Sequence, residues 1–462
     1  MELKTKTINR CGCKAAAVFM LFSLLLISPA CKKFVEIDSV TDKLLASQVY
    51  TSDATSNSAI AGIYRQFKTN LQDPIFIYNS LASDDIVNYS PSVTFDPYST
   101  NTLLSNDPRL AWANLYNIVY ATNSAIEGLS AGKGTSESAR QYYLGEAKFN
   151  RALAYFYLVN WFGDVPLVLT TDVSVSATAS RTPAAQVYTQ IIADLKDAQA
   201  ALGDDYSYTG GDRSRANKWV ATALLARVYL YQKDWVNAKL QADAVINSGL
   251  YSLLDGPTGI FEQNNAEAIL QWSNYSSESN FSAGNFIFNT TPNLICRDNL
   301  LNAFEPGDLR KTTWIASKAY NGATYYYPYK FTTTSPNTTE WFVVLRLAEQ
   351  YLIRAEANAM QNDFTDAVAD INLIRLKHGG LTTALPVPAD QKTCMDLIMN
   401  QRQVDLFTEG CHRWFDLKRT GRIDAVMTAE KPATWQSSSA LYPIPLGDIL
   451  KDPNLKQNPG YQ

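Results

Sequence analysis

Histidine is almost absent from this chain. His378 and His412 are the only two among 462 residues. Neither can be paired from the sequence with a nucleophile or a second ligand, which argues against a histidine-based triad or metal site. His378 precedes two glycines, so we expect it at the C-terminal end of a helix. We therefore predict no enzymatic activity, no catalytic residue, no metal and no cofactor.

Cysteine and positive charge are also scarce. The six cysteines show no CxxC spacing, which argues against a zinc site or a disulfide framework. Three of them lie beyond the N-terminal region, and at most one bridge could form among Cys296, Cys394 and Cys411. The formal charge is −4 at pH 7 and no block of basic residues is present. We therefore expect no nucleic-acid partner.

Apolar runs of transmembrane length are missing after the N-terminus. The chain begins with several basic residues and an apolar run over 15–27, which is short for a membrane span and typical of a signal peptide. A small residue then precedes Cys31, as in bacterial lipoprotein signals. We predict a signal peptide over 1–30, lipidation of Cys31 and a tether over 31–40, so that the protein is anchored to a membrane. Ordinary signal cleavage with an incidental cysteine is the alternative.

Helical periodicity dominates the rest of the chain. Apolar residues recur at helical spacing over 112–119, 149–156 and 187–202, and two more helices are expected over 217–231 and 234–246. Short loops between neighbouring helices favour antiparallel hairpins. Four tryptophans on these apolar stripes are expected in the core: Trp112, Trp161, Trp219 and Trp235.

An internal repeat indicates the type of helical fold. Its first copy has a small residue, a tyrosine, a turn residue, an aromatic residue and an alanine, in that order, at Ala226, Tyr229, Asp234, Trp235 and Ala238. The second copy lies 129 residues later, at Ala355, Asn358, Asp363, Phe364 and Ala367, and has asparagine in place of the tyrosine. This rhythm is typical of tetratricopeptide units, so we predict an all-α superhelix of about four units. Generic helical hairpins are the alternative.

Charged side chains lie within these apolar helices. We expect them to form buried or half-buried ion pairs that fix helix packing, rather than to bind a ligand. The residues are Arg151, Arg346, Glu349, Glu356, Arg413, Asp416 and Arg419. Asp84 and Asp85 are adjacent and would diverge on any regular element, so we interpret them as capping or solvated residues rather than an acid–base pair.

Two stretches interrupt the helical pattern. Residues 68–108 contain several X-Pro steps, and residues 250–340 are rich in Asn, Ser, Thr, Gly, Pro and Tyr. Within the second stretch we expect short strands over 267–272 and 286–288. Long irregular segments in a compact protein usually carry function, so we predict that a rigid helical scaffold holds two loop-rich regions that bind the ligand.

Aromatic side chains in these two stretches are the best candidates for ligand contact. A sugar ring can stack its apolar face on such a ring, while its hydroxyls need polar partners at the rim. We expect the candidate rings to stand free of the core; alternatively, each of them packs a loop onto the scaffold. The ring candidates are Tyr89, Phe95, Tyr98, Tyr275, Trp314, Tyr325 and Tyr327. The rim candidates are Asn88, Asn274 and Asp85.

Six stretches carry the motifs of one known family. They are GEA–RA–FGDVPL over 145–167, LLARVYL over 224–230, RLAE–AEA over 346–357, EG–R–WFDLKR over 409–419, LYPIP over 441–445 and QNPGY over 457–461. Each motif is short, but the ordered set resembles the SusD/RagB family. The chain departs from the family pattern at 401–405 and at His412, and both departures concern the scaffold.

The resemblance implies a fold, a location and a role. It implies tetratricopeptide-like helices with long irregular loops and a few short strands, in an N-terminal part over 41–250 and a C-terminal part over 251–462. The family consists of lipoproteins on the outer membrane of Bacteroidota, facing the cell exterior. They capture oligosaccharides without catalysis and pass them to a SusC-like TonB-dependent transporter. A lid of the same type that captures peptides, or an assembly scaffold with no small ligand, stays open as an alternative.

Overall fold

Helices form most of the structure, a computed structural model that describes residues 49–462 apart from 133, 275–280 and 335–338. The predicted signal peptide, Cys31 and the tether lie outside the described residues. Residues Tyr50–Gln462 form one unit. The helices of its first half, with η for π or 3-10 turns, are α3 (Asp53–Asp73), η2 (Pro74–Tyr78), α4 (Asn79–Ala82), α5 (Asp96–Ser99), α6 (Trp112–Ser130), α7 (Glu137–Phe162), α8 (Val173–Ser176), α9 (Ala184–Ala201), η3 (Ser207–Thr209), α10 (Lys218–Tyr231) and α11 (Trp235–Ile246).

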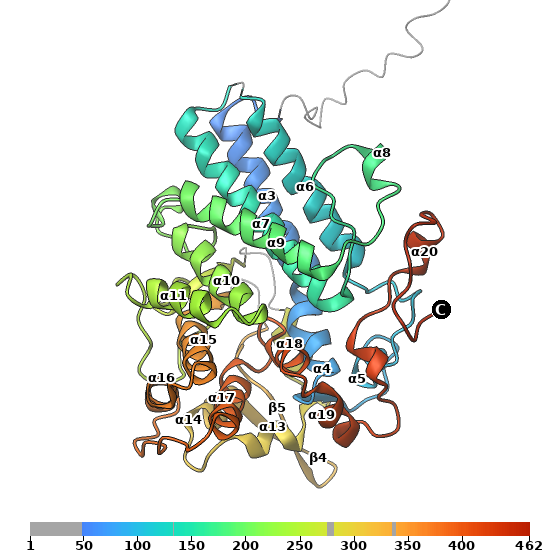
Figure 1. The fold of residues 1–462 in the computed structure, drawn as a ribbon. Coiled ribbons are helices and arrows are strands. Elements are labelled where there is room, and N and C mark those ends of the chain that lie inside the picture. The colour runs from blue at the N-terminus through green and yellow to red at the C-terminus, as the bar shows by residue number, and fades with distance from the viewer. Residues whose placement is uncertain (1–48, 133, 275–280, 335–338) are drawn as a thin grey trace, which may run out of the picture. The chain divides into compact units, whose positions relative to one another are not determined.

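The helices of the second half follow in chain order. They are α12 (Phe281–Phe286), α13 (Asp298–Ala303), α14 (Leu309–Trp314), α15 (Leu347–Met360), α16 (Phe364–Lys377), α17 (Gln391–Leu406), α18 (His412–Arg419), α19 (Ile423–Glu430), η4 (Ser437–Ala440) and α20 (Leu446–Ile449). In Figure 1, α3, α6, α7 and α9 form a bundle, and α10, α11, α15 and α16 follow it as successive hairpins. The predicted mostly helical fold is confirmed.

Close helix packing follows from the residues at the contacts. Helix α7 packs against α6 on one side and α9 on the other. A Cβ atom at Gly145 would lie 3.1 Å from Ala201 and 3.0 Å from Leu202, so a glycine lets α7 and the end of α9 approach closely. Of the four tryptophans expected in the core, Trp112 and Trp161 are buried, while Trp219 and Trp235 are half-buried against it.

The two predicted repeat copies have the same backbone geometry. Asp234 and Asp363 are the N-caps of α11 and α16, with φ/ψ of −85°/76° and −91°/77°. Each carboxylate accepts a hydrogen bond from the backbone N–H three residues later. The preceding residue has a positive φ in both copies, 59° at Lys233 and 65° at Asn362. The short turns predicted from the repeat are therefore confirmed.

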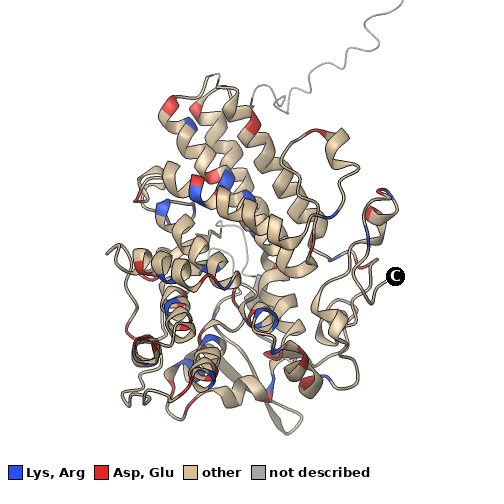
Figure 2. Ribbon diagram, in the orientation of Figure 1, with Lys and Arg blue, Asp and Glu red and all other residues tan. Residues whose placement is uncertain are grey.

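Buried ion pairs link the helices, as predicted from the charges on their apolar faces. Arg227 pairs with Glu349 between α10 and α15, and both side chains are 1% exposed. The other predicted charges are paired as well: Arg151–Asp194, Arg346–Glu409, Arg413–Asp84, Arg402–Asp416 and Arg419–Glu356. Figure 2 shows both signs of charge intermixed along the ribbon. These charges are part of the scaffold, and this confirms their predicted structural role.

The prediction that Asp84 and Asp85 are capping or solvated residues is wrong. Both are almost fully buried, because the turn after α4 lies under α18. Two hydrogen bonds of 2.7 Å join the Arg413 guanidinium to Asp84. Gln403 Nε2 donates to Asp85 Oδ1 over 3.1 Å. Burial, and then the neighbouring Asp84, raise the pKa of Asp85 to about 7.

The expected helix end at His378 is confirmed, because this residue is the C-cap of α16. Its ring is fully buried, with Nδ1 2.9 Å from Asp405 and Nε2 2.9 Å from Glu267. Burial lowers the pKa of His378, but the two carboxylates outweigh this effect and raise it to about 9. The side chain therefore belongs to a core ion network.

Among the described residues, three two-stranded antiparallel sheets lie between the helices. The first pairs β1 (Ile86–Asn88) with β3 (Leu294–Cys296), and the second pairs β2 (Ala268–Trp272) with β6 (Phe342–Arg346). The third is the hairpin of β4 (Ile315–Tyr320) and β5 (Ala323–Pro328). The strand expected over 267–272 is confirmed. The strand expected over 286–288 is wrong, because Phe286 ends α12 and packs its side chain into the core.

The first loop region begins later than predicted. Helix α3 runs to Asp73 and continues through the π-helix Pro74–Tyr78 into α4, so the segment 68–82 is helical. Pro74 lacks an N–H and its ring clashes with the preceding turn of a regular helix. The wider π-turn accommodates that ring, and all five residues of η2 are buried. Apolar burial therefore keeps the chain helical across the Asp73–Pro74 step.

Candidate functional site

Two tyrosines far apart in sequence meet at the surface. Tyr89 extends strand β1, since its N–H donates to Asn293 O over 2.8 Å, and Tyr325 lies on β5. Their ring centroids are 4.8 Å apart in an edge-on arrangement, and their hydroxyl oxygens are 3.0 Å apart. Tyr89 is 41% exposed. Both residues are among the predicted candidates, and the structure brings them together.

A third ring extends this pair. The centroid of Tyr320, at the end of β4, lies 6.3 Å from that of Tyr325. We call Tyr89, Tyr320 and Tyr325 the tyrosine surface. Tyr320 was not among the predicted residues, although Asn321-Gly322 after it is a strong hairpin signal that would have placed Tyr320 and Tyr325 on neighbouring strands.

The loop that carries Tyr89 is held in place by Asp96. Asn88 Nδ2 donates to Asp96 Oδ1 over 2.6 Å, and the Ser92 N–H donates to Asp96 Oδ2 over 2.8 Å. Phe95 is half-buried and packs on Tyr78, with ring centroids 6.4 Å apart. Asn88 and Phe95 therefore position the loop, and the side-chain NH2 of Asn88 is already engaged.

Several predicted ring candidates belong to the core instead. Tyr98 is 2% exposed and stacks on Tyr78 with centroids 4.5 Å apart. Trp314 is also 2% exposed, and its indole N–H donates to Pro257 O over 3.0 Å. Tyr327 is buried beside Phe288. The expectation that these rings stand free of the core is wrong, because the irregular segments fold back onto the helices and bury their large side chains.

The predicted rim residues are also engaged within the protein. Asp85 is 1% exposed and lies in the buried network described above. Asn274 is half-buried, and its Nδ2 donates to Glu340 O over 2.7 Å. Tyr275 lies outside the described residues. Of the predicted set, Tyr89 and Tyr325 are the rings that the structure places together with solvent access.

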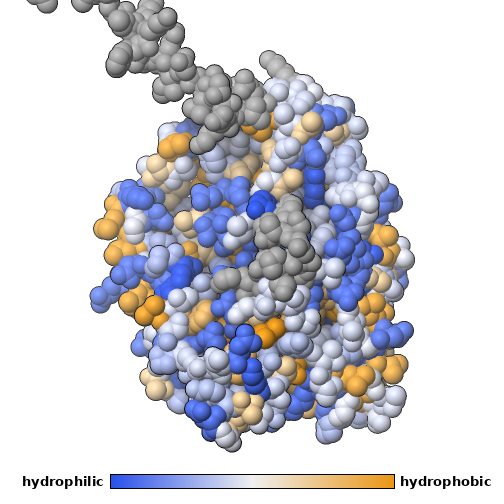
Figure 3. All heavy atoms as spheres, turned by 180° about the vertical axis from the view of Figure 1, so that it is seen from behind, coloured by the Kyte–Doolittle hydropathy of each residue, from blue (hydrophilic) through white to orange (hydrophobic). Residues whose placement is uncertain are grey.

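The tyrosine surface suits a neutral ligand with apolar faces and hydroxyl groups. Each ring offers an apolar face together with a phenol that donates and accepts hydrogen bonds. The hydrogen bond between the two phenols raises the pKa of Tyr89 above its usual value, so it is uncharged at neutral pH. On the face drawn in Figure 3, the described apolar side chains form small groups separated by hydrophilic ones. Such a face differs from the broad apolar patches of many protein interfaces.

Disulfide bonds, metal sites and membrane-spanning helices are three further features on which the described residues bear. The three cysteines Cys296, Cys394 and Cys411 are buried free thiols, so the structure pairs none of them. Within the described ranges, no group of three or more His, Cys, Asp or Glu side chains is placed to hold a metal ion. Among those same residues, no helix is both long enough and apolar enough to cross a bilayer.

Two family models and several known proteins match this chain. A family model described as "Starch-binding associating with outer membrane" matches residues 33–230, and the model of the SusD family matches residues 263–461. The SusD-like protein P25 of Formosa agariphila is 25% identical, over 96% of this chain and 98% of its own length.

Solved structures share the fold. A laminarin binding SusD-like protein superposes with a TM-score of 0.74 at 23% identity, over 89% of this chain and 100% of its own. The surface glycan-binding protein A from Bacteroides fluxus gives a TM-score of 0.75 at 22% identity, over 89% and 100% of the two chains. These likenesses establish the helical architecture of this chain.

Proposed function

This chain belongs to the SusD family, and we propose that it captures carbohydrate outside the cell and passes it to a SusC-like TonB-dependent transporter in the outer membrane. One family model describes starch binding and outer-membrane association, and two proteins of the same fold are described as binding laminarin and surface glycans. The proposed role is binding without catalysis.

The observation that carries this proposal is the exposed contact between Tyr89 and Tyr325. By analogy with aromatic pairs, a sugar stacked on an aromatic ring would contribute on the order of 0.5–1.5 kcal/mol beyond area burial. Two or three such contacts give moderate affinity, which suits a protein that must release its cargo to a transporter. The loop below Tyr89 is fixed by Asp96, so little ordering is needed when the ligand binds.

We propose further that the mature protein is anchored by lipid on Cys31, after removal of residues 1–30. The basic start, the short apolar run and the small residue before Cys31 support this anchor. The tether over 31–40 would connect the lipid to the folded unit. Co-purification with a large outer-membrane β-barrel in mild detergent is the expected sign of the transporter partner, and crosslinking that recovers the monomer alone would count against it.

The ligand class is tested by isothermal titration against a panel. The panel contains neutral glucans such as laminarin and starch fragments, a uronic-acid polymer, and peptides of mixed sequence. Binding of a neutral glycan supports the proposal, because the three residues of the tyrosine surface offer apolar ring faces and phenol hydroxyls. Binding of peptides alone would favour a peptide-capturing lid. A protein that binds its transporter but no panel member would instead favour an assembly scaffold.

A further inference from the structure

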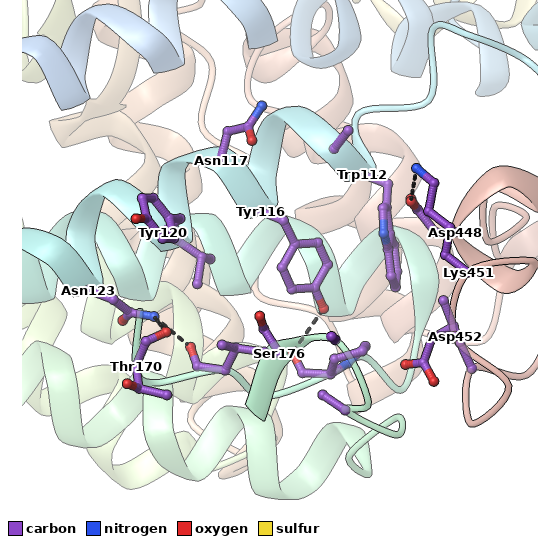
Figure 4. A pocket seen from close by; sticks show the side chains of 17 residues that line it. Trp112, Tyr116, Asn117, Tyr120, Asn123, Thr170, Ser176, Asp448, Lys451 and Asp452 are labelled. Carbon is purple, nitrogen blue, oxygen red and sulfur yellow. Dashed lines mark hydrogen bonds and ion pairs between the residues drawn. The ribbon is translucent and has the colours of Figure 1, made fainter. Parts of the chain in front are cut away.

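A cavity of about 520 Å³ opens along helix α6, and it shares no residue with the tyrosine surface. Its walls come from three parts of the chain: one face of α6, the segment 166–179 that includes α8, and the C-terminal segment 448–455, which begins in α20. We call it the α6 pocket (Figure 4). Its volume lies within the range of small-ligand sites.

Three aromatic rings form the floor of the α6 pocket. Trp112, Tyr116 and Tyr120 follow each other at intervals of four residues, which places them along one face of the helix. The rings of Trp112 and Tyr116 lie 4.9 Å apart. In Figure 4, Tyr116 lies between Tyr120 and Trp112. Tyr120 is 57% exposed, so its ring is accessible to a ligand from solvent.

The opposite wall is fixed by hydrogen bonds from the scaffold. The Tyr116 hydroxyl donates to Pro166 O over 2.9 Å. Asn123 Nδ2 donates to Val168 O over 3.0 Å and to Thr170 O over 3.2 Å. Asn123 Oδ1 in turn accepts a hydrogen bond of 3.0 Å from Arg151, which is paired with a buried aspartate. The pocket is therefore shaped before any ligand arrives.

The rim of the α6 pocket is polar. Asp448, Lys451 and Asp452 lie at the Trp112 end, and Asn117 contributes an exposed amide from α6. Lys451 and Asp448 form a loose pair of 3.9 Å between side chains that are 80% and 36% exposed. Carboxylate and amide oxygens in this position accept hydrogen bonds from hydroxyl groups. Two carboxylates against one ammonium also disfavour an anionic ligand.

We propose that the α6 pocket is a second carbohydrate site, which holds one or two rings of a neutral oligosaccharide. The apolar face of one pyranose would stack on Tyr120 and Tyr116, and the hydroxyls of a second ring at the Trp112 end would donate to Asp448 and Asp452. This inference rests on the proposed function, because it assigns the same ligand class to a separate part of the molecule. A chain with two sites binds a long glycan with higher apparent affinity than either site alone.

The test isolates the pocket by removing the tyrosine surface. Laminaritriose and maltotriose are titrated into a Tyr89→Ala/Tyr325→Ala background, in which one weak site should remain. Adding Tyr120→Ala should weaken this residual binding by about fivefold, on the scale of one stacked ring. Ala113→Trp should abolish it by filling the pocket mouth from an exposed position on α6. Leu450→Ala is the matched control, since this side chain is 77% exposed next to the rim residue Lys451 but does not line the pocket.

Each outcome decides between the two claims. Wild-type protein that binds neither trisaccharide nor any other glycan of the panel overturns both the proposed function and the second site. If wild-type binding disappears completely in the Tyr89→Ala/Tyr325→Ala background, the proposed function is upheld and the second site is overturned. If the residual binding survives Ala113→Trp, the ligand does not bind in the α6 pocket, and the second site is overturned as well. A phenylalanine-containing tripeptide that binds this background in place of the saccharides would overturn the ligand class. Thermal midpoints are recorded for every variant, and an unchanged midpoint is expected for Tyr120→Ala.

Discussion

Replacing Glu349 with glutamine tests whether buried ion pairs hold the helical hairpins together. Arg227 Nε and Nη2 each donate to a Glu349 carboxylate oxygen over 2.6 Å, and Nη2 also donates to Val344 O over 3.1 Å. Both side chains are 1% exposed. Removing one charge leaves the other buried without compensation, which costs about 3–5 kcal/mol. Glu349→Gln should therefore lower the free energy of unfolding by about that amount.

Urea unfolding followed by circular dichroism measures this change. Asp396→Asn is the matched control, because Asp396 pairs with Lys392 and Arg422 on the surface. Exposed pairs contribute about 0–1 kcal/mol, so the control should remain close to wild type. An Arg227→Met/Glu349→Leu variant should recover most of the loss, because no unpaired charge remains. A Glu349→Gln variant that unfolds within about 1 kcal/mol of wild type, or a surface control that loses as much, would show that the buried pair does not hold the hairpins together.

Three further predictions concern the anchor, the core rings and pH. Cys31→Ala should abolish labelling by a palmitate analogue and release the protein from membranes; an unlabelled wild type that stays soluble would refute the anchor. Tyr98→Ala and Trp314→Ala should each destabilise the fold by about 3–5 kcal/mol in thermal unfolding, because both rings are 2% exposed. The raised pKa of Asp85, about 7 against an ordinary 3.8, means that the folded state holds a proton that the unfolded chain releases. Stability should therefore fall as pH rises between these two values, and Asp85→Asn should flatten that fall in urea unfolding at pH 5 and pH 8; an unchanged slope would contradict it.

The helical scaffold could be predicted from the sequence because its signals are local. The repeat at Asp234 and Asp363 fixes a turn through its own side-chain cap, and a charge such as Arg151 on an apolar helix face implies a buried partner. The Asp73–Pro74 step misled the prediction, since proline usually marks a helix end, whereas here apolar burial maintains the helix through a π-turn.

The candidate site was less predictable because it depends on tertiary packing. Composition identified the loop-rich regions but not the direction of each side chain, so Tyr98 and Trp314 looked equivalent to Tyr89. The contact between Tyr89 and Tyr325 joins residues 236 positions apart, and no local pattern specifies such a pair. The α6 pocket was missed for the same reason: Trp112 and Tyr116 form an ordinary apolar stripe until segments 166–179 and 448–455 are placed over them.

The affinity of the tyrosine surface for the neutral glycan that binds best in the panel is the most direct test of carbohydrate capture by this protein. Isothermal titration compares wild type, Tyr89→Ala/Tyr325→Ala, and Tyr326→Ala, a control on the same strand whose side chain is 42% exposed and alternates to the opposite face of the hairpin. We expect binding at least about tenfold weaker in the double variant, equal to about 1.4 kcal/mol, with the control and the thermal midpoints unchanged. A double variant that binds as tightly as wild type, or a control that loses as much, would show that the tyrosine surface does not hold the glycan.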